Sequence, residues 1–363
     1  STGVHWNSTG NDDWLITPQL NLTSNSTVSF SFWGRSLHAT YLEDFNVKVS
    51  TSGNDVSDFT TAIDTVVSTP YAWTEYSYDL SAYAGQDIYL AVQCVSYDDF
   101  YLFVDDFELV TDPLDVTYVP DDNFEQALID LGYDDVLDDY VVTDSINSVT
   151  VLDVSNDSIS DLTGIEDFTA LTNLNCRGNQ LTSLDVSSNT ALTELTCYAN
   201  ALDSLDVSSN TALTELHCSN NQLTSLDVSS NTALTFLDCG GNALDSLDVS
   251  NNTALTFLNC GGNALDSLDV SSNTALTDLS CDWNQLTSLN VSNNTTLTEL
   301  ACNNNQLTNL DVSNNTALTK LNCDTNQLTS LDLTANTALT TLVCYTNALT
   351  ALDVSSNTSL TWM

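Results

Sequence analysis

Nine cysteines recur at a constant spacing of 21 residues, and thiols at fixed intervals can bind metals, form disulfides or fill an apolar core. They are Cys176, Cys197, Cys218, Cys239, Cys260, Cys281, Cys302, Cys323 and Cys344. Zinc is disfavoured, because no repeat supplies a matching His or a second Cys. Equivalent residues of stacked repeats would have parallel Cα–Cβ bonds, a geometry that suits disulfides badly. We therefore expect these cysteines, and the isolated Cys94, to be buried free thiols.

Candidate catalytic groups are scarce in spite of the many carboxylates. Histidine occurs only at His5, His38 and His217, and the chain contains neither a Gly-x-Ser-x-Gly nor a His-Glu-x-x-His pattern. A glycosidase would need two acids facing each other across a cleft, and no pair stands out from the 49 acidic residues. The sequence thus predicts no catalytic residues and no enzymatic activity.

The charge of the chain is extreme, with 49 Asp and Glu against 4 Lys and Arg and a formal net charge of -45. Such a surface repels nucleic acid and anionic membranes, so we expect neither as a partner. It suits saline surroundings that contain calcium, where salt screens the repulsion; the simpler alternative is that acidity maintains solubility. No apolar run is long enough to span a membrane and no signal peptide opens the chain, so we expect a trimmed piece without membrane insertion.

The cysteine spacing belongs to a longer repeat that begins near residue 149 and carries leucines at fixed offsets, as in residues 192–202. A fixed period of about 20–29 residues with such leucines is typical of a leucine-rich repeat solenoid, and residues 149–363 closely resemble that family. The leucine and cysteine columns should then point inward on rungs about 4.8 Å apart. Because the last unit stops where its next strand should begin, we expect the solenoid to be incomplete at its C-terminus.

Two polar columns accompany the leucines through the repeats. One is an asparagine ladder, whose side chains should satisfy backbone groups in the turn after each strand. It consists of Asn179, Asn200, Asn221, Asn242, Asn263, Asn284, Asn305, Asn326 and Asn347. The other consists of Asp185, Asp206, Asp227, Asp248, Asp269, Asp311, Asp332 and Asp353, with Asn290 in one repeat. Like charges one rung apart repel, so these carboxylates should cap turns; shared calcium ions are the alternative.

Three outward columns vary, although the rest of the repeat is nearly copied from unit to unit. Their side chains should face the concave surface of the solenoid, which is the usual binding face of such proteins. We expect Phe236 and Phe257 to be exposed neighbours there, with Trp283 one rung further on. An aromatic floor with a polar rim suits a sugar ring or an apolar peptide side chain; the alternative is that the two rings only stabilise the ladder. The candidate ligand-binding residues are Phe236, Phe257, Trp283, His217, Asp238, Asn259, Asp278 and Tyr198.

Residues 1–111 contain short alternating apolar runs separated by turns, which predicts an all-β sandwich. The segments DWLITPQL, which begins at Asp13, and LFVDDF, which begins at Leu102, resemble the two ends of the jelly-roll module of bacterial cleaved adhesins. Only 13 residues precede Trp14, fewer than in that family, so the opening strand of the module should be incomplete or supplied elsewhere. Such modules are similar to calcium-binding jelly rolls, so the resemblance makes Asp12 and Asp105 candidate calcium ligands; exposed turn acids are the alternative.

Residues 112–120 should form a linker, because two prolines disfavour regular structure there. Asp122 can cap a helix whose third residue, Glu125, completes a capping box. An apolar stripe of helical spacing follows, so residues 121–148 should form an N-terminal cap of the solenoid with a short helix. The stripe consists of Phe124, Ala127, Leu128 and Leu131.

The second half of each repeat, Asp-Val-Ser-x-Asn-Thr-Ala-Leu, resembles units in secreted proteins of Bacteroidota, many of which leave the cell by the type IX route. This resemblance implies an extracellular protein, secreted or attached to the cell surface. Asp-Ser or Asp-Thr followed by an apolar residue resembles the O-glycosylation signal of exported proteins in that group. The candidate glycosylation sites are Ser145, Ser158, Ser204, Ser246, Ser267 and Thr65.

The sequence therefore predicts a mainly β protein, with an N-terminal β-sandwich of the jelly-roll type and a helix-capped leucine-rich repeat solenoid of 21-residue repeats. The predicted function is that of an extracellular adhesin, which binds a glycan or a protein on a cell or surface through the concave face. Two alternatives stay open: a structural spacer or self-assembling subunit of a surface appendage, and a carbohydrate-binding accessory of a secreted hydrolase. Calcium is the only cofactor that the sequence suggests. The alternative of a self-assembling subunit would require a homo-oligomer or a larger surface assembly as the partner.

Overall fold

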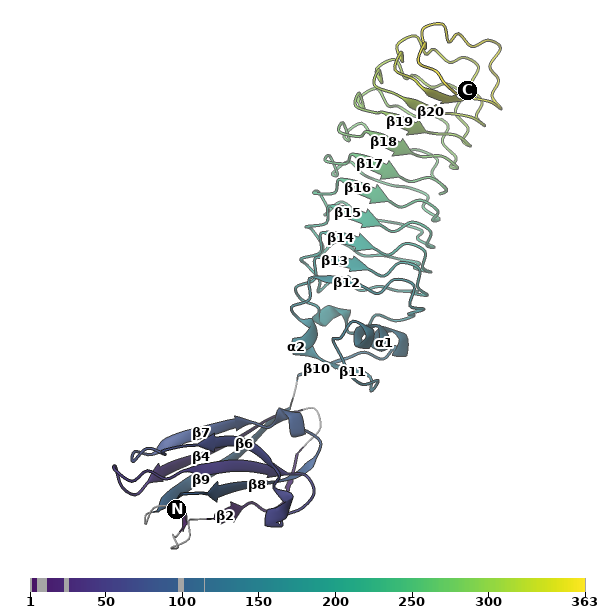
Figure 1. Ribbon diagram of the computed structural model, residues 1–363. Helices are drawn as coiled ribbons and strands as arrows, with labels where there is room; N and C mark the ends of the chain where they lie inside the picture. The colour runs from purple at the N-terminus through teal and green to yellow at the C-terminus, as the bar shows by residue number, and fades with distance from the viewer. Residues whose placement is uncertain (1, 5–11, 23–25, 97–100, 114, 363) are drawn as a thin grey trace. The chain divides into compact units, whose positions relative to one another are not determined.

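The chain forms two compact units, Ser1–Asp115 and Val116–Met363, called the N-terminal unit and the repeat unit below (Figure 1). The computed structural model describes residues 2–4, 12–22, 26–96, 101–113 and 115–362, and His5 lies outside this part. Each unit has its own apolar core. No helix in the described ranges is long and apolar enough to cross a membrane.

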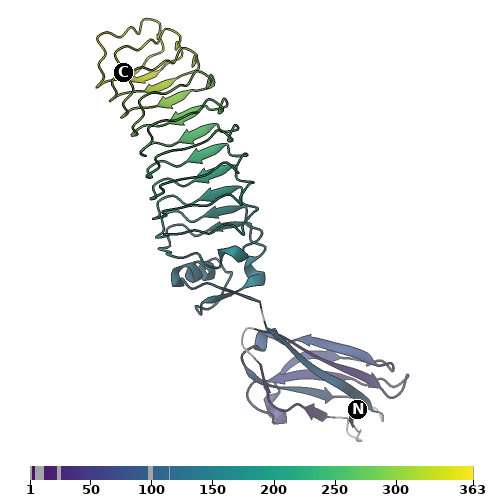
Figure 2. The same cartoon turned by 180° about the vertical axis from the view of Figure 1, so that it is seen from behind.

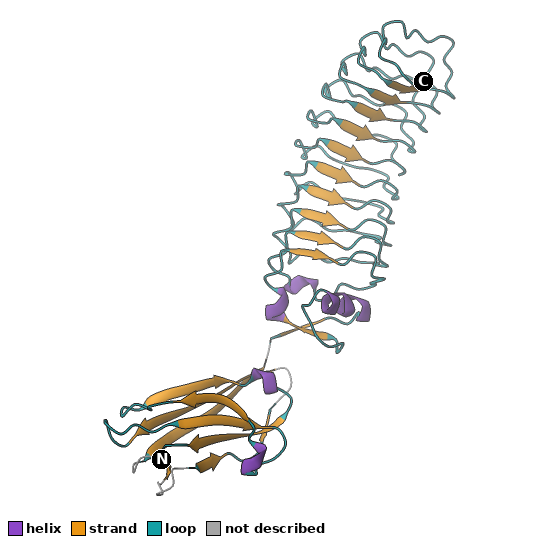
Figure 3. Cartoon of the chain, viewed as in Figure 1, coloured by secondary structure: helices purple, strands orange, loops and turns teal. Residues whose placement is uncertain are grey.

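The described residues of the N-terminal unit form two antiparallel sheets (Figure 3). The first sheet contains, in spatial order, β1 (Thr2–Val4), β9 (Leu102–Pro113), β4 (Ser26–Ser36) and β7 (Thr74–Asp79). The second contains β2 (Asp13–Ile16), β8 (Asp87–Cys94), β5 (Phe45–Ser50) and β6 (Thr61–Val66), with β3 (Leu20–Asn21) also paired to β8. The connections include the 3-10 helices η1 (Val56–Asp58) and η2 (Ser81–Tyr83). Fully buried Phe32 of β4 and Phe45 of β5 lie with ring centroids 5.8 Å apart, so the two sheets share one core and the predicted β-sandwich is confirmed.

The junction between the units differs from the predicted linker. Strand β9 continues to Pro113, and β10 (Val116–Tyr118) pairs with β11 (Tyr140–Val142), so strands occupy much of residues 112–120. Pro113 has no backbone N–H to donate, but it is the last residue of β9, where this donor is not needed.

The predicted helix of the cap is α1 (Asp122–Asp130), but its N-cap residue is Asp121 rather than Asp122. The Oδ1 atom of Asp121 accepts hydrogen bonds from the backbone N–H groups two and three residues further on, at 3.0 and 3.1 Å. Glu125 therefore falls one residue too late for a capping box. It is fully buried instead, and its Oε1 accepts the backbone N–H of Asp138 at 2.8 Å, which ties down the segment before β11. A second short helix, α2 (Thr143–Ile146), completes the cap.

Within the described residues, ten parallel strands of the repeat unit form one ladder, which both views show along the length of the solenoid (Figures 1 and 2). They are β12 (Val151–Asp153), β13 (Asn173–Asn175), β14 (Glu194–Thr196), β15 (Glu215–His217), β16 (Phe236–Asp238), β17 (Phe257–Asn259), β18 (Asp278–Ser280), β19 (Glu299–Ala301), β20 (Lys320–Asn322) and β21 (Thr341–Val343). The 3-10 helix η3 (Ile165–Asp167) lies between β12 and β13. One apolar core runs from Val119 in the cap to Leu342 in the last strand. This confirms the predicted helix-capped leucine-rich repeat solenoid.

The cysteine column lies inside this core. Every cysteine from Cys176 to Cys323 in the column is buried, Cys344 is partly buried, and Cys94 is buried in the N-terminal unit. All of them are free thiols, as expected from the spacing. Burial raises the pKa of the Cys197 thiol to about 12, so this side chain behaves as an apolar group at neutral pH.

Two asparagine ladders, rather than the single predicted one, hold the turns of the repeats. In the predicted ladder, Asn263 Nδ2 donates to the carbonyl of Cys260 at 3.0 Å, and Asn263 Oδ1 accepts the backbone N–H of Leu244 at 3.0 Å. In the second ladder, Asn252 Nδ2 donates to two buried carbonyls at 2.9 Å, and its Oδ1 is buried without a hydrogen-bond partner among the described residues. The second ladder consists of Asn189, Asn210, Asn231, Asn252, Asn273, Asn294, Asn315, Asn336 and Asn357.

Candidate functional site

The outward side chains of β13–β21 form a continuous surface, called the sheet face below. In each strand the first and third residues point outward, while the middle leucine points into the core. Successive strands are in register, so residues that are 21 apart in sequence become neighbours, as Phe236 and Phe257 do. Most of the predicted ligand-binding residues lie on this face, namely His217 on β15, Phe236 and Asp238 on β16, Phe257 and Asn259 on β17, and Asp278 on β18.

An aromatic stack lies at the middle of the sheet face. The rings of Phe236 and Phe257 are 4.2 Å apart between centroids and nearly parallel, with an interplanar angle of 1°. On the other side of Phe236, the imidazole of His217 lies 4.4 Å away. The phenylalanines are half-buried rather than exposed as predicted, because each ring covers a face of its neighbour. The stack therefore stabilises the ladder, and the outer ring, Phe257, forms the edge of a hollow.

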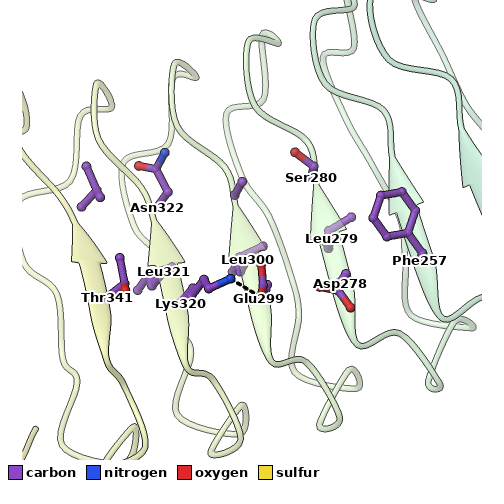
Figure 4. Close-up of a pocket in the computed structure, with 12 residues that line it drawn as sticks. Phe257, Asp278, Leu279, Ser280, Glu299, Leu300, Lys320, Leu321, Asn322 and Thr341 are labelled. Carbon is purple, nitrogen blue, oxygen red and sulfur yellow. Dashed lines mark hydrogen bonds and ion pairs between the residues drawn. The ribbon is translucent and has the colours of Figure 1, made fainter. Parts of the chain in front are cut away.

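That hollow extends from Phe257 over β18–β21 and has a volume of about 330 Å³ (Figure 4). Its floor includes the outward surface of strand residues such as Ala301 and Val343, and Asp278 lies on its side next to Phe257. Lys320 Nζ donates to Glu299 Oε1 at 2.5 Å across two neighbouring strands. Lys320 and Glu299 occupy one of the outward columns that vary between repeats, but neither is among the ligand-binding residues predicted from the sequence. The signal was available, since Lys320 is one of only 4 basic residues in the chain.

Other predicted residues are engaged with neighbouring rungs. Asp238 accepts hydrogen bonds from Ser219 Oγ and from Asn259 Nδ2, each at 2.9 Å. Tyr198 Oη accepts a hydrogen bond from Arg177 Nη1 at 2.8 Å. These acceptors are thus part of an internal network between repeats, and a ligand would have to share them.

Trp283 does not line the hollow. It follows β18 in a turn, where its backbone has φ of +50° and its side chain is 63% exposed. A left-handed backbone strains a bulky residue, and the same turn position carries glycine or asparagine in several other repeats. The residues of this column with positive φ are Gly178, Ala199, Asn220, Gly241, Gly262, Trp283, Asn304, Thr325 and Thr346. The predicted aromatic group is therefore split between the stack on the sheet face and an isolated ring on the turn.

One group of side chains has the composition and spacing of a metal site. Ligand atoms of Glu194, Glu215 and His217 all lie within 4.8 Å of one another, and we call these residues the carboxylate–imidazole cluster. His217 Nε2 is 3.6 Å from Glu215 Oε2, and Asn173 Nδ2 orients Glu194 by a hydrogen bond of 2.7 Å to its Oε2. Imidazole with carboxylates suits Zn²⁺ and similar divalent ions. His217 thus has two contacts, with the cluster and with the stack.

The predicted calcium ligands lie in different sheets of the N-terminal unit. Asp12 precedes β2, and its Oδ1 accepts hydrogen bonds from Trp14 Nε1 and Gln93 Nε2, each at 2.7 Å. These bonds lower the pKa of the Asp12 carboxyl. Asp105 lies on β9, and neither residue belongs to a group of three His, Cys, Asp or Glu ligands in the described part of the chain. The calcium assignment stays a prediction.

The aspartate column caps turns, as expected. Asp248 Oδ1 accepts the backbone N–H of Ser250 at 2.9 Å, and Asn290 makes the same contact with Ser292 at 3.1 Å. The interaction with Ser250 lowers the pKa of the Asp248 carboxyl.

The predicted O-glycosylation residues are all exposed, which such a modification requires. Three of them, Ser204, Ser246 and Ser267, donate a side-chain hydrogen bond to the preceding aspartate at 2.8–2.9 Å.

Two protein families match the chain, one in each unit. The Cleaved Adhesin Domain matches residues 2–109, and the LRR domain of the endo-beta-N-acetylglucosaminidase EndoS matches residues 144–252.

Individual relatives resemble parts of the chain. Internalin J of Listeria monocytogenes serotype 4b (strain F2365) is 39% identical over 72 residues, which are 20% of this chain and 8% of that protein. Hemagglutinin A of Porphyromonas gingivalis (strain ATCC BAA-308 / W83) is 31% identical over 115 residues, which are 26% of this chain and 5% of that protein. The chain thus spans less than a tenth of the length of either relative.

A solved structure extends the likeness over most of the chain. The functional domain of InlJ from Listeria monocytogenes, which includes a cysteine ladder, superposes with a TM-score of 0.65 at 44% identity, covering 68% of this chain and 56% of that one. An internalin (inlF) from the same species has a TM-score of 0.58 at 25% identity, covering 67% of this chain and 81% of that one. The resemblances to leucine-rich repeat proteins and to cleaved adhesins are confirmed: the repeat unit has an internalin-like leucine-rich repeat fold, and the N-terminal unit matches the Cleaved Adhesin Domain.

Proposed function

We propose that the protein is an extracellular adhesin, which binds a glycan or a protein on another surface through the sheet face. The observation that carries the proposal is the hollow beside Phe257. It lies where the side chains vary between repeats that are otherwise nearly copies, and a scaffold alone gives no reason for this variation.

The lining of the hollow suits recognition of a small polar group with an apolar face. The ring of Phe257 and the side chains of Ala301 and Val343 supply apolar surface, and Ser280 and Asn322 supply hydrogen-bonding groups. The ion pair between Lys320 and Glu299 places a donor and an acceptor side by side at the opening (Figure 4). Sugar hydroxyls and peptide amides each need such paired groups.

The relatives support binding rather than catalysis. A hemagglutinin and an internalin are among the proteins that parts of the chain resemble. The described residues of the sheet face bring together no nucleophile and general base in the arrangement that covalent catalysis requires. We therefore infer a binding protein that is secreted or held at the cell surface.

The test uses the full chain, intact cells and an immobilised glycan panel. Asp278→Ala with Lys320→Ala removes polar groups of the hollow, and Gln285→Ala with Gln306→Ala is the matched control on exposed side chains of another face. Binding should fall at least about tenfold in the first variant and stay unchanged in the control, because loss of a charged hydrogen bond costs about 1.5–3 kcal/mol. Equal binding by both variants would contradict the proposal. Periodate treatment of the cells distinguishes a glycan partner from a protein partner.

The match to the EndoS repeat domain favours one second candidate, a carbohydrate-binding accessory of a secreted hydrolase. That function predicts that residues 1–111 bind a polysaccharide and that Asp278→Ala with Lys320→Ala leaves this affinity unchanged. The spacer alternative predicts no ligand at all, and its self-assembly would appear as concentration-dependent growth in sedimentation experiments.

A further inference from the structure

A guanidinium group surrounded by aromatic rings lies on the outer face of the first sheet of the N-terminal unit. Arg35 is near the end of β4, where it is paired with Phe103 of β9 and adjoins the segment that leads into β7. The Arg35 Cζ atom is 5.0 Å from the ring centroid of Phe103, 5.1 Å from that of Trp73 and 5.8 Å from that of Tyr71. Rings from two separate stretches of the chain thus converge on one cation from a third.

Arg35 has no acidic partner in the described part of the chain, although 49 carboxylates are available in the sequence. Its Nε atom is buried and makes no hydrogen bond. Its two Nη atoms make no hydrogen bond within the described residues but are not fully buried, so they reach solvent. Donors of a guanidinium that are left unpaired cost free energy unless a ligand supplies the acceptor.

The rings around Arg35 keep much of their surface free. Tyr71 is 52% exposed and Trp73 is 41% exposed. Rings that cover the flat face of a guanidinium leave the N–H groups at its edge able to bind a carboxylate through two parallel hydrogen bonds. The exposed parts of Trp73 and Tyr71 offer apolar surface next to that edge, against which the C–H face of a sugar ring can pack.

We propose that Arg35, Trp73, Tyr71 and Phe103 form a binding site for a sugar that bears a single carboxylate. The formal net charge of -45 excludes a polyanionic glycan, which the whole surface would repel, whereas one carboxylate experiences mainly the local field of Arg35 within the Debye length of about 8 Å. This site is independent of the hollow on the repeat unit, and its failure would leave the proposed function of the sheet face untouched.

The test follows the two arginine Nε–Hε signals of the full chain by NMR, since Arg35 and Arg177 are its only arginines. Arg177→Lys assigns the signals. The chain is titrated with methyl β-glucuronoside, with its neutral methyl ester and with acetate. The Arg35 signal should shift saturably with the glucuronoside, at least about tenfold more weakly with either control ligand, and the Arg177 signal should not move.

Two variants separate recognition from folding. Arg35→Gln keeps most of the side-chain stem against the rings and should abolish binding of the glucuronoside. Arg35→Lys keeps the charge but loses the planar fork, and should weaken this binding about tenfold. In both variants binding is followed by tryptophan fluorescence. Arg35→Lys thus tests the site even if Arg35→Gln does not fold. An equal response to the ester would overturn the role of Arg35, and acetate binding as tightly as the glucuronoside would overturn the sugar specificity. Wild-type affinity in Arg35→Lys, or no saturable shift at all, would overturn the site.

Discussion

The aromatic stack allows a quantitative prediction about which of its members stabilise the fold. Phe236 lies between two rings, His217 at 4.4 Å and Phe257 at 4.2 Å, whereas Phe257 has one ring neighbour and the hollow on its other side. Half-burial of a phenylalanine contributes about 1 kcal/mol, and each ring pair adds about 0.5–1.5 kcal/mol. Phe236→Ala should therefore lower the free energy of unfolding by about 2–4 kcal/mol, and Phe257→Ala by about 1.5–2.5 kcal/mol.

A double-mutant cycle isolates the contact between the two rings. The loss in the double variant should be smaller than the sum of the single losses by about 1 kcal/mol, which is the energy of the shared ring pair. Urea unfolding of the full chain, followed by circular dichroism, gives these values. Asp278→Ala, at the equivalent position of the next strand, is the control and should change stability by no more than about 0.5 kcal/mol.

The cycle also distinguishes support from recognition. If Phe236 supports Phe257 and only Phe257 contacts a ligand, then Phe257→Ala should reduce adhesion strongly, and Phe236→Ala should reduce it less while destabilising more. A coupling energy near zero would refute the stacking argument, and equal loss of adhesion in both variants would refute the division of roles.

Three further results are expected. Zn²⁺ should bind the carboxylate–imidazole cluster, and competition with a chromogenic chelator measures this binding. His217→Ala should abolish the binding of Zn²⁺, and unchanged binding in this variant would rule the cluster out. The pKa of the Asp248 carboxyl is lowered in the folded state, so its contribution to stability is present above the unfolded pKa of about 3.9 and is lost as pH falls through the folded value. Asp248→Asn should therefore lose less stability than the unchanged protein between pH 6 and pH 3. An unaltered pH profile of stability would contradict this. A thiol reagent should label Cys344 first and the rest of the column only after unfolding, because Cys344 alone in the column is partly exposed; rapid labelling of the whole column would show that the core is open.

Much of the repeat unit could be predicted because the chain contains its own comparison. A column that never changes, such as the cysteines, must be structural, and a column that varies must be outward-facing. The second asparagine ladder was equally invariant, yet it was missed, since Asn252 and its equivalents lie in short polar stretches and look like turn residues. Only the stacked repeats show that their amide groups are buried against backbone carbonyls.

The errors arose where one residue of register decides the outcome. Asp121 and Asp122 are both able to cap a helix, and the sequence favoured the second because Glu125 then completed a capping box. In the structure Asp121 also accepts hydrogen bonds from Ser160 and Asp161, which lie beyond the cap. Such a contact between distant segments has no local signal in the sequence. The burial of Phe236 likewise depends on how neighbouring rungs stack.

The few basic residues carry more information about function than the many acids do. Among the four Lys and Arg residues, all of which the structure describes, only Lys320 forms an ion pair with a carboxylate of the described residues, while Arg35, Lys48 and Arg177 each lie over an aromatic ring. Neutralising acidic charge would place every cation beside a carboxylate, so charge balance does not explain these positions. Lys48 lies over Trp14 and Arg177 over Tyr198, and Arg177 also donates to the Tyr198 hydroxyl, so these two cations have internal roles. Arg35 and Lys320 differ, because one has no hydrogen-bond acceptor of its own and the other lines a hollow, and this difference is the physical reason to seek ligands beside them.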